Sequence, residues 1–582
     1  MTRLRHALVF TAVAVAFADS SIVVLAVPEI VGEFDVDVGA ASWVITAYNV
    51  AVVAAGALLI PVSVQIRTAR LAAFAFAGFA LASAGCAAAT SFGLLVGCRT
   101  VQGAAAALLL VAALPLLGGR AGVRTWILAG TIGFAAGPAL GGLLTEFFSW
   151  RSIFAVQAPL VALGLLALRR QAYPAEPEGG PRPPRAWLAL ATLGAVSAAL
   201  VGALFLVVVL LVNGLGWQPL PAALVATTLP VLAGIAERAG LSLPARPAAV
   251  AGGILVTVGL ATLAFLPGPR TSLIVAGLAL CGIGLGLAAQ PLGRLTLARE
   301  PLGSAGAWTV VARHAGLVVA LVVVTPVLVS SLTDLKTDAE AVGGDLVLES
   351  QLPLAQKVPL LVDLAEATES VEADVPDLSP VFEPHETGLG VVTRLGNRLT
   401  DALHHLVTQA FRAPFLACAG FGVLASLLAL GLGRTPGRVK LPAAAFVLAA
   451  LVAGVIALAS DFRLGALDEA PNADPCRAPS TFEGGGVDET TQRVALNALA
   501  GAACDLETSR ASILRALASS EPLPWPRERL TDSVRRGLVD AVDAEREAGR
   551  LEGVLGVLLS AAAANAPLDW ILDELGVPTE GG

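Results

Sequence analysis

The feature that most constrains this chain is the recurrence of long apolar runs separated by short polar hinges. Most runs are about 20 residues long, which at helical rise is enough to cross the hydrocarbon core of a bilayer. A helix is the element that satisfies every backbone hydrogen bond of such a run internally. Hydrophobic residues make up 56% of the 582 residues and charged residues only 14%, whereas about a quarter of a soluble protein is charged. The sequence therefore predicts an all-α polytopic membrane protein.

Hydropathy and helical length predict thirteen spans. They lie near residues 6–27, 42–64, 71–90, 92–116, 124–145, 151–169, 187–212, 219–236, 248–267, 271–292, 304–332, 412–433 and 441–460. If the N-terminus is cytoplasmic, the arginines gather in the inside loops, as the positive-inside rule requires. The expected location is the bacterial cytoplasmic membrane, with a multi-pass chain whose N-terminus is cytoplasmic and whose C-terminus is extracytoplasmic.

The polar segments divide these spans into domains. The expected order is an N-terminal six-helix bundle at 1–170, a Pro/Gly-rich cytoplasmic linker at 171–186, a C-terminal six-helix bundle at 187–433 with an extracytoplasmic insert at 333–411, the additional span at 441–460, and an extracytoplasmic helical domain at 461–582. The insert and the tail each carry a net charge of −10, from 14 acids and 4 bases and from 21 acids and 11 bases. We expect these two outer segments to pack together over the external mouth.

Two charged side chains interrupt the spans of the first bundle. Asp19 lies within "FTAVAVAFADSSIVVLAVPEI" and Arg99 within "CRTVQGAAAALL". A charge at mid-depth is costly, but opposite charges that share a cavity lower each other's cost. Gln102 lies three residues after Arg99 and shares its helix face. Either Asp19 exchanges protons or meets cationic cargo in a central cavity, with Arg99 tuning it, or the pair is a static clamp between helices.

Span five contains the glycine motif "GTIGFAAGPALGGLL". Gly133, Gly137 and Gly141 recur every four residues, with Gly142 beside them, and such a stripe lets another helix approach closely. Pro138 removes one backbone donor and can bend the helix.

Further candidates rest on weaker patterns. Tyr48 and Asn49 on span two and His314 on span eleven are candidates for lining the cavity. Cys476 and Cys504 lie in the outer tail, where a disulfide is chemically allowed, and we expect them to pair. No metal site is predicted, because no histidine or cysteine spacing matches one.

These motifs, in this order and on these spans, resemble those of the major facilitator superfamily. The resemblance is strongest to its drug:proton antiporter group with fourteen spans, here with a twelve-span core. It implies two six-helix bundles, proton coupling by the first-span acid and the fourth-span arginine, and a glycine motif at the interface where the two bundles move.

One signature of that family is incomplete here. The loop between spans two and three reads "PVSVQIRTARLAAF" and lacks the expected acid and glycine. The equivalent loop of the second half, "AGIAERAG", keeps Glu237, Arg238 and Gly240. The resemblance assigns these three residues to a cytoplasmic gate.

The expected function is secondary active transport by alternating access: proton-coupled efflux of small lipophilic, drug-like or envelope-related molecules. The expected partners are a small-molecule substrate, protons, the lipid bilayer and an envelope protein that binds the extracytoplasmic domain. Neither a nucleic acid, a cofactor nor an enzymatic activity is expected. The alternative is a non-transporting membrane scaffold or sensor whose extracytoplasmic domain binds a partner.

Overall fold

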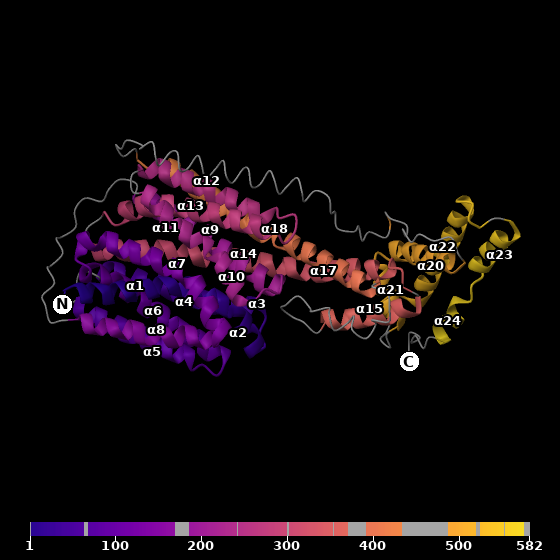
Figure 1. Cartoon of the computed structure of the whole chain (residues 1–582), viewed down its shortest axis with the longest axis horizontal. Helices are drawn as coiled ribbons and strands as arrows, with labels where there is room; N and C mark the ends of the chain where they lie inside the picture. Colours follow the sequence, from indigo (N-terminus) through magenta and orange to yellow (C-terminus); the bar gives the residue numbers. More distant parts are fainter. Residues whose placement is uncertain are drawn as a thin grey trace. The chain divides into compact units, whose positions relative to one another are not determined.

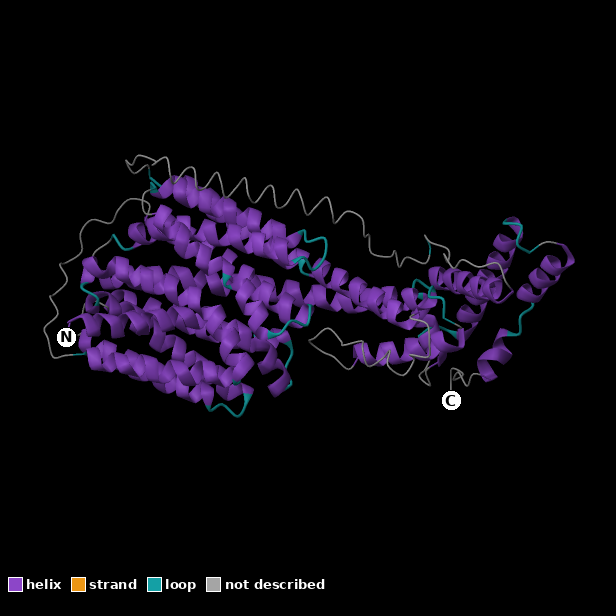
Figure 2. Cartoon of the chain, viewed as in Figure 1, coloured by secondary structure: helices purple, strands orange, loops and turns teal. Residues whose placement is uncertain are grey.

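The computed structural model describes most of the chain and shows helices joined by loops (Figure 2). The described residues are 2–62, 68–168, 186–240, 243–298, 302–352, 354–369, 391–433, 476, 487–518, 524–551 and 553–574, and they contain no strand. They form two compact units, which are treated separately below. Unit 1 is Met1–Ser331 with Thr408–Leu467, and unit 2 is Leu332–Val407 with Asp468–Gly582.

Unit 1 is a bundle of long helices, labelled in Figure 1. Its N-terminal half contains α1 (Thr2–Ile22), η1 (Val23–Ala26), α2 (Val27–Phe34), α3 (Val38–Ala41), α4 (Trp43–Val62), α5 (Thr68–Ala87), α6 (Phe92–Leu116), η2 (Gly119–Gly122), α7 (Val123–Phe147), α8 (Trp150–Ala162) and η3 (Leu163–Ala167). Its C-terminal half contains α9 (Ala186–Val209), η4 (Leu210–Gly214), α10 (Pro219–Ala226), α11 (Thr228–Gly240), α12 (Ala245–Ala264), α13 (Thr271–Thr296), the first part of α14 (Leu302–Leu348) and α18 (Arg412–Leu430).

Twelve described helices are long and apolar enough to cross a membrane, which confirms the all-α polytopic class. The predicted thirteenth span, 441–460, and residues 171–185 of the predicted linker lie outside the described residues. The predicted eleventh span, 304–332, lies within a longer helix, because α14 continues to Leu348. The polar stretch from Thr333 onward contains no proline that would end the helix earlier.

Glycines of α7 allow close helix packing within unit 1. The Cα hydrogens of Gly133, Gly137 and Gly141 on α7 face α1, where an added Cβ would meet backbone or side-chain atoms of residues 14–25. Helices α1 and α7 are in contact along their lengths. Small residues at these positions allow that approach.

The fourth glycine of the motif has a different partner. A Cβ on Gly142 would meet Ala223 and Pro219 of α10, in the C-terminal half. Pro138 is buried within α7. The sequence analysis assigned the whole motif to the interface between the halves, and here the structure corrects it: three of its glycines serve packing inside the N-terminal half.

Unit 2 combines the insert with the C-terminal tail. Beside the end of α14 it contains α15 (Leu354–Glu369), α17 (Val391–Ala410), α20 (Val487–Asp505), α21 (Arg510–Ala518), α22 (Arg527–Glu547), α23 (Gly553–Ala564) and α24 (Leu568–Glu574). One core joins leucines of the insert, such as Leu360 and Leu399, to Leu496 of the tail. A disulfide links Cys476 to Cys504. The insert and the tail therefore pack together, as the sequence led us to expect.

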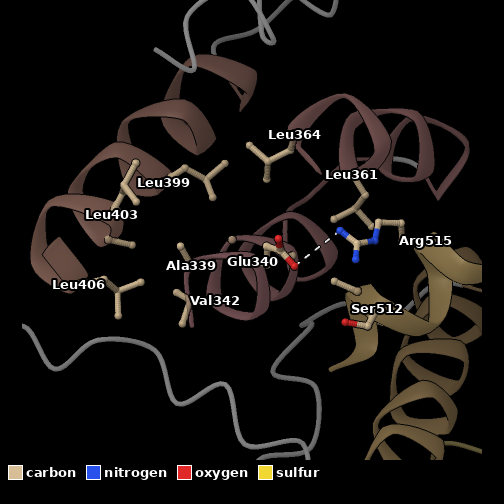
Figure 3. A pocket seen from close by; sticks show the side chains of 14 residues that line it. Ala339, Glu340, Val342, Leu361, Leu364, Leu399, Leu403, Leu406, Ser512 and Arg515 are labelled. Atoms are coloured by element: carbon tan, nitrogen blue, oxygen red, sulfur yellow. Dashed lines mark ion pairs between the residues drawn. The ribbon is translucent and has the colours of Figure 1, made fainter. Parts of the chain in front are cut away.

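A small pocket lies inside unit 2 (Figure 3). Its volume is about 60 Å³, and leucines of α15 and α17 line much of it. Arg515 of α21 faces Glu340 of α14 across one side, 3.5 Å apart. Beside this pair, a shorter bridge joins tail to insert: Arg510 lies 2.9 Å from Asp345 and 3.0 Å from Glu349.

Candidate functional site

The first candidate feature is a buried ion pair inside the N-terminal half. Helix α1 carries Asp19 and α6 carries Arg99, and both side chains are 0% exposed. The Arg99 Nη1 donates to Asp19 Oδ2 at 2.5 Å and to Gln102 Oε1 at 2.6 Å. The Arg99 Nε donates to the Val44 carbonyl at 2.9 Å. A buried charge pair offsets its desolvation only when further hydrogen bonds support it, and the bonds to Gln102 and Val44 give part of that support here.

Polar side chains from other helices extend this pair into a network. Gln102 Nε2 donates to Ser83 Oγ of α5 at 2.8 Å and to Gln157 Oε1 of α8 at 3.0 Å. Sequence reasoning missed Ser83 and Gln157, although an uncharged polar residue in an apolar run was the available signal. Five helices (α1, α4, α5, α6 and α8) thus contribute to one polar cluster, which is completed by an aromatic ring: the Arg99 Cζ lies 4.4 Å from the centroid of Tyr48.

The network is not fully satisfied. Among the described residues, the second oxygen of Asp19, Oδ1, and the second terminal nitrogen of Arg99, Nη2, have no hydrogen-bond partner. An unpaired polar atom in the interior costs free energy, so this pair is less secure than its short distance indicates.

The second candidate feature is a central cavity between the two halves of unit 1. Its volume is about 120 Å³. It is lined by Phe17, Ser20, Val24, Ile45, Asn49, Trp126, Ile127, Gly130, Thr131, Phe134, Leu193, Ser197, Leu200, Leu204, Phe205, Pro230, Ala233, Glu237, Leu285, Gly286, Ala289, Gly293, Thr309, Val310, Arg313 and Leu317. A mostly apolar wall with a few polar groups is typical of small-molecule sites.

The structure corrects the placement of the predicted coupling residues. Asp19, Arg99 and Gln102 were expected to face the cavity, but none of the three is among its lining residues. The reason is that the Asp19 carboxylate turns toward α6 and pairs with Arg99 there. Its neighbours on α1, Phe17 and Ser20, line the cavity instead.

Three further residues, Tyr48, Asn49 and His314, were predicted to line the cavity. Asn49 lines the cavity, whereas Tyr48 and His314 do not. Tyr48 points into the N-terminal half, where its hydroxyl donates to the Ala16 carbonyl at 3.0 Å. His314 is buried behind Asn49, with its Nδ1 2.7 Å from Asn49 Oδ1. This last contact joins α4 of one half to α14 of the other.

The residues that were predicted to form the cytoplasmic gate lie at the end of α11. Glu237 is buried and lines the central cavity, and its Oε1 accepts a hydrogen bond from Gln290 Nε2 of α13. The gate role of Glu237 stays a prediction. Arg238 and Gly240 lie in the last turn of α11, and their side-chain surroundings fall outside the described part of the chain.

Arg313 is the second charged residue of the cavity wall. Its Cζ lies 4.4 Å from the ring centroid of Phe17 and 5.8 Å from that of Phe134. Both rings belong to the N-terminal half, whereas Arg313 belongs to α14. No metal-binding group of three or more His, Cys, Asp and Glu occurs among the described residues.

Several known proteins are similar to parts of this chain. The lincomycin resistance protein of Streptomyces lincolnensis is 35% identical over 161 residues, which cover 26% of this chain and 32% of that protein. The multidrug efflux pump LfrA of Mycolicibacterium smegmatis is 30% identical over 173 residues, covering 28% and 34%. The riboflavin transporter RibZ of Clostridioides difficile is 28% identical over 158 residues, covering 26% and 34%. The chain therefore spans about a third of the length of each of these relatives.

A solved structure shares the fold over a longer range. A bacterial homologue of the human lysosomal transporter Spinster, in an inward-facing and unoccupied conformation, superposes with a TM-score of 0.51 at 14% identity. The match covers 75% of this chain and 99% of that protein. Residues 9–321, more than half of the chain, match the Major Facilitator Superfamily. With twelve spanning helices, a cavity between two halves and this match across the membrane unit, the chain is a member of the major facilitator superfamily.

Proposed function

We propose that this transporter couples proton movement to the export of small molecules by alternating access. The observation that carries the proposal is the buried Asp19–Arg99 pair. Helix α1, which carries Asp19, lines the central cavity with Phe17 and Ser20. Helix α6, which carries Arg99, packs against α1 and α4. Ionisable residues inside a membrane bundle mark proton or substrate pathways by default. Export is supported by similarity to a lincomycin resistance protein and to a multidrug efflux pump.

The proposed coupling step begins with protonation of Asp19. A neutral carboxyl loses most of its attraction to Arg99, which keeps its bonds to Val44 and Gln102. Helix α1 is then held less firmly against α6. Since Phe17 and Ser20 on α1 line the cavity, a shift of α1 changes the cavity wall. Protonation thereby biases the equilibrium between two conformations.

A second route leads from the same pair to the C-terminal half. Tyr48 stacks on Arg99, and the next residue, Asn49, lines the cavity and contacts His314 of α14. The proposed topology keeps the N-terminus cytoplasmic and unit 2 outside, on the basis of the arginine distribution. An envelope protein that binds unit 2 stays a prediction.

The test is a flux measurement in proteoliposomes with an internal pH-sensitive dye. A panel of lipophilic cations, antibiotics, organic acids and lipids is supplied under a proton gradient. We expect Asp19→Asn to bring cargo-dependent proton flux to the level of empty liposomes while the protein still purifies as a folded monodisperse species. The matched control is Asp35→Asn: Asp35 is exposed and has a positive φ of 52°, which Asn also tolerates.

Two outcomes would contradict the proposal in different ways. Native flux in Asp19→Asn removes the coupling role of this residue. Absence of flux for every compound with the native protein, despite correct insertion, favours the scaffold or sensor alternative, in which unit 2 binds a partner.

A further inference from the structure

Arg313 of α14 differs from Arg99 in its surroundings. Arg99 is fully buried and has three acceptors: the Asp19 carboxylate, the Gln102 amide oxygen and the Val44 carbonyl. Arg313 is partly buried, and the structure gives it two aromatic contacts, with Phe17 and Phe134, and no ion pair within the described residues. Its charge is permanent, since a guanidinium does not lose its proton in a protein. A charge that is partly withdrawn from water is stabilised by a hydrogen-bonded anion.

The two rings hold Arg313 in place without neutralising it. A guanidinium over an aromatic face is attracted by the ring quadrupole, which partly replaces water. The rings supply no anion, so the charge of Arg313 is not neutralised by them, and the N–H donors of a guanidinium lie along the edge of its plane. In the fork geometry of arginine, that edge matches the two oxygens of a carboxylate or phosphate. Because Arg313 lines the cavity, an acidic ligand there can supply the missing partner.

The other residues of the cavity wall restrict the chemical class of the ligand further. Its ionisable residues are Arg313 and Glu237. The Glu237 carboxylate already accepts a hydrogen bond from the Gln290 amide. The wall is otherwise mainly aliphatic and aromatic, with Trp126 and Phe205 among its rings. Glu237 thus has a hydrogen-bond donor but keeps its negative charge, whereas Arg313 has no hydrogen-bond acceptor among the described residues. Arg313 is therefore the group that an acidic ligand with an apolar body can pair with.

We propose that the central cavity binds amphipathic or aromatic molecules that carry an acidic group, with Arg313 pairing to that group. The apolar body lies against the aromatic wall. Glu237 acts as an opposing charge that weakens the binding of such anions and favours cations. This inference rests on the proposed transport function and names its substrate class.

The experiment measures binding to the purified full-length protein in detergent by isothermal titration calorimetry. The probes are three naphthalene derivatives with one ring system: 2-naphthoate, 2-naphthyl phosphate and 2-naphthylmethylammonium. We expect both anions to bind more tightly than the ammonium. Arg313→Gln should weaken anion binding by about 10- to 100-fold, the value of a lost hydrogen-bonded charge contact, and should leave ammonium binding unchanged or tighter.

Three further variants make the result specific. Arg313→Lys keeps the charge but loses the planar fork, so we expect a smaller loss than in Arg313→Gln. Glu237→Gln should tighten anion binding severalfold and weaken ammonium binding. Arg412→Gln is the matched control, because Arg412 also lies over an aromatic ring, that of Phe265 at 4.5 Å, but does not line the cavity. We expect native affinities for this variant.

Several outcomes overturn the proposal. These are native anion affinity in Arg313→Gln, an equal loss for anions and the ammonium, or a native protein that prefers the ammonium. If Arg313→Gln does not purify as a folded species, the comparison of Arg313→Lys with Glu237→Gln decides, because the two must move anion affinity in opposite directions. Binding needs no proton gradient, so failure of proton coupling and failure of this assignment are seen separately.

Discussion

At the scale of single residues, charge placement separates two roles. The Asp19–Arg99 pair is closed within the N-terminal half, whereas Arg313 and Glu237 face the cavity. The sequence left open whether Asp19 and Arg99 face a cavity or form a static clamp between helices, because periodicity reports depth along a helix but not which neighbour a side chain meets. In the structure the Asp19 carboxylate pairs with Arg99 between helices and does not line the cavity.

A residue-scale prediction concerns Glu545 in unit 2. Hydrogen bonds from Arg550 at 2.8 Å and Arg493 at 2.9 Å lower the pKa of this carboxyl to about 2. Because the folded pKa lies below the ordinary value of 4.5, the stabilisation is fully present above pH 4.5 and is lost as the pH falls toward 2. We expect a loss of about 2–3 kcal/mol of unfolding free energy in this region across that window.

Hydrogen exchange of α20 and α22 in the full-length protein, corrected for intrinsic rates, measures this loss between pH 5 and pH 3. Glu545→Gln should be less protected at pH 6 and should lack the pH-dependent change. A native protein with constant protection over the window would contradict the assigned ion pairs. Arg535, whose bond to Asp532 lies on the exposed side of α22, offers the control Arg535→Gln with native behaviour.

At the scale of elements, the glycines of α7 pack against two different helices. Gly133 faces α1 within its own half, and Gly142 faces α10 of the other half. Sequence spacing identified the smooth stripe but not its partners, since a four-residue repeat is equally suited to any close neighbour. Twelve of the thirteen predicted spans have a counterpart among the described helices, because hydropathy depends on local composition. The end of α14 was not predictable in this way, because a helix that leaves the membrane needs no apolar residues.

The glycine assignment predicts different effects for the two positions. Gly133→Ala should destabilise the N-terminal half by about 1–3 kcal/mol through overpacking against α1, seen as a lower unfolding temperature. Gly142→Ala should lower cargo flux more than stability, because its Cβ meets the half that must move. The control is Gly97→Ala on α6, where an added Cβ meets nothing within 4 Å. Equal losses of stability and flux in both variants would remove the distinction.

At the scale of the whole molecule, the chain combines a superfamily membrane unit with a second unit built from two distant segments. The match to the family ends at residue 321, before the insert begins. Contact between insert and tail was foreseen from topology and from leucines that needed burial. The individual bridges were not, because two segments each of net charge −10 give no sign of which acids meet which arginines.

The last prediction tests how unit 2 is held together. Arg510 is buried and joins α21 to Asp345 of α14 and to Glu349, the residue that follows α14. Arg510→Met removes the cation but leaves two neighbouring carboxylates without it, and breaking a buried pair in this way costs about 3–5 kcal/mol. Exchange protection should therefore fall in α15 and α21 together, since the core shared by insert and tail opens as one.

Arg515→Gln provides the matched comparison on the same helix. Its pair with Glu340 is longer, 3.5 Å, and its side chain is 40% exposed, so the loss should stay below about 1 kcal/mol. Equal effects of the two variants would show that the bridges contribute only general charge neutralisation. A larger loss of protection in Arg510→Met than in Arg515→Gln would mean that the insert depends on the tail for its stability. A deletion of the tail would then also unfold the insert. Any change of flux after such a deletion must therefore be compared with the flux of Arg510→Met before it is assigned to the tail.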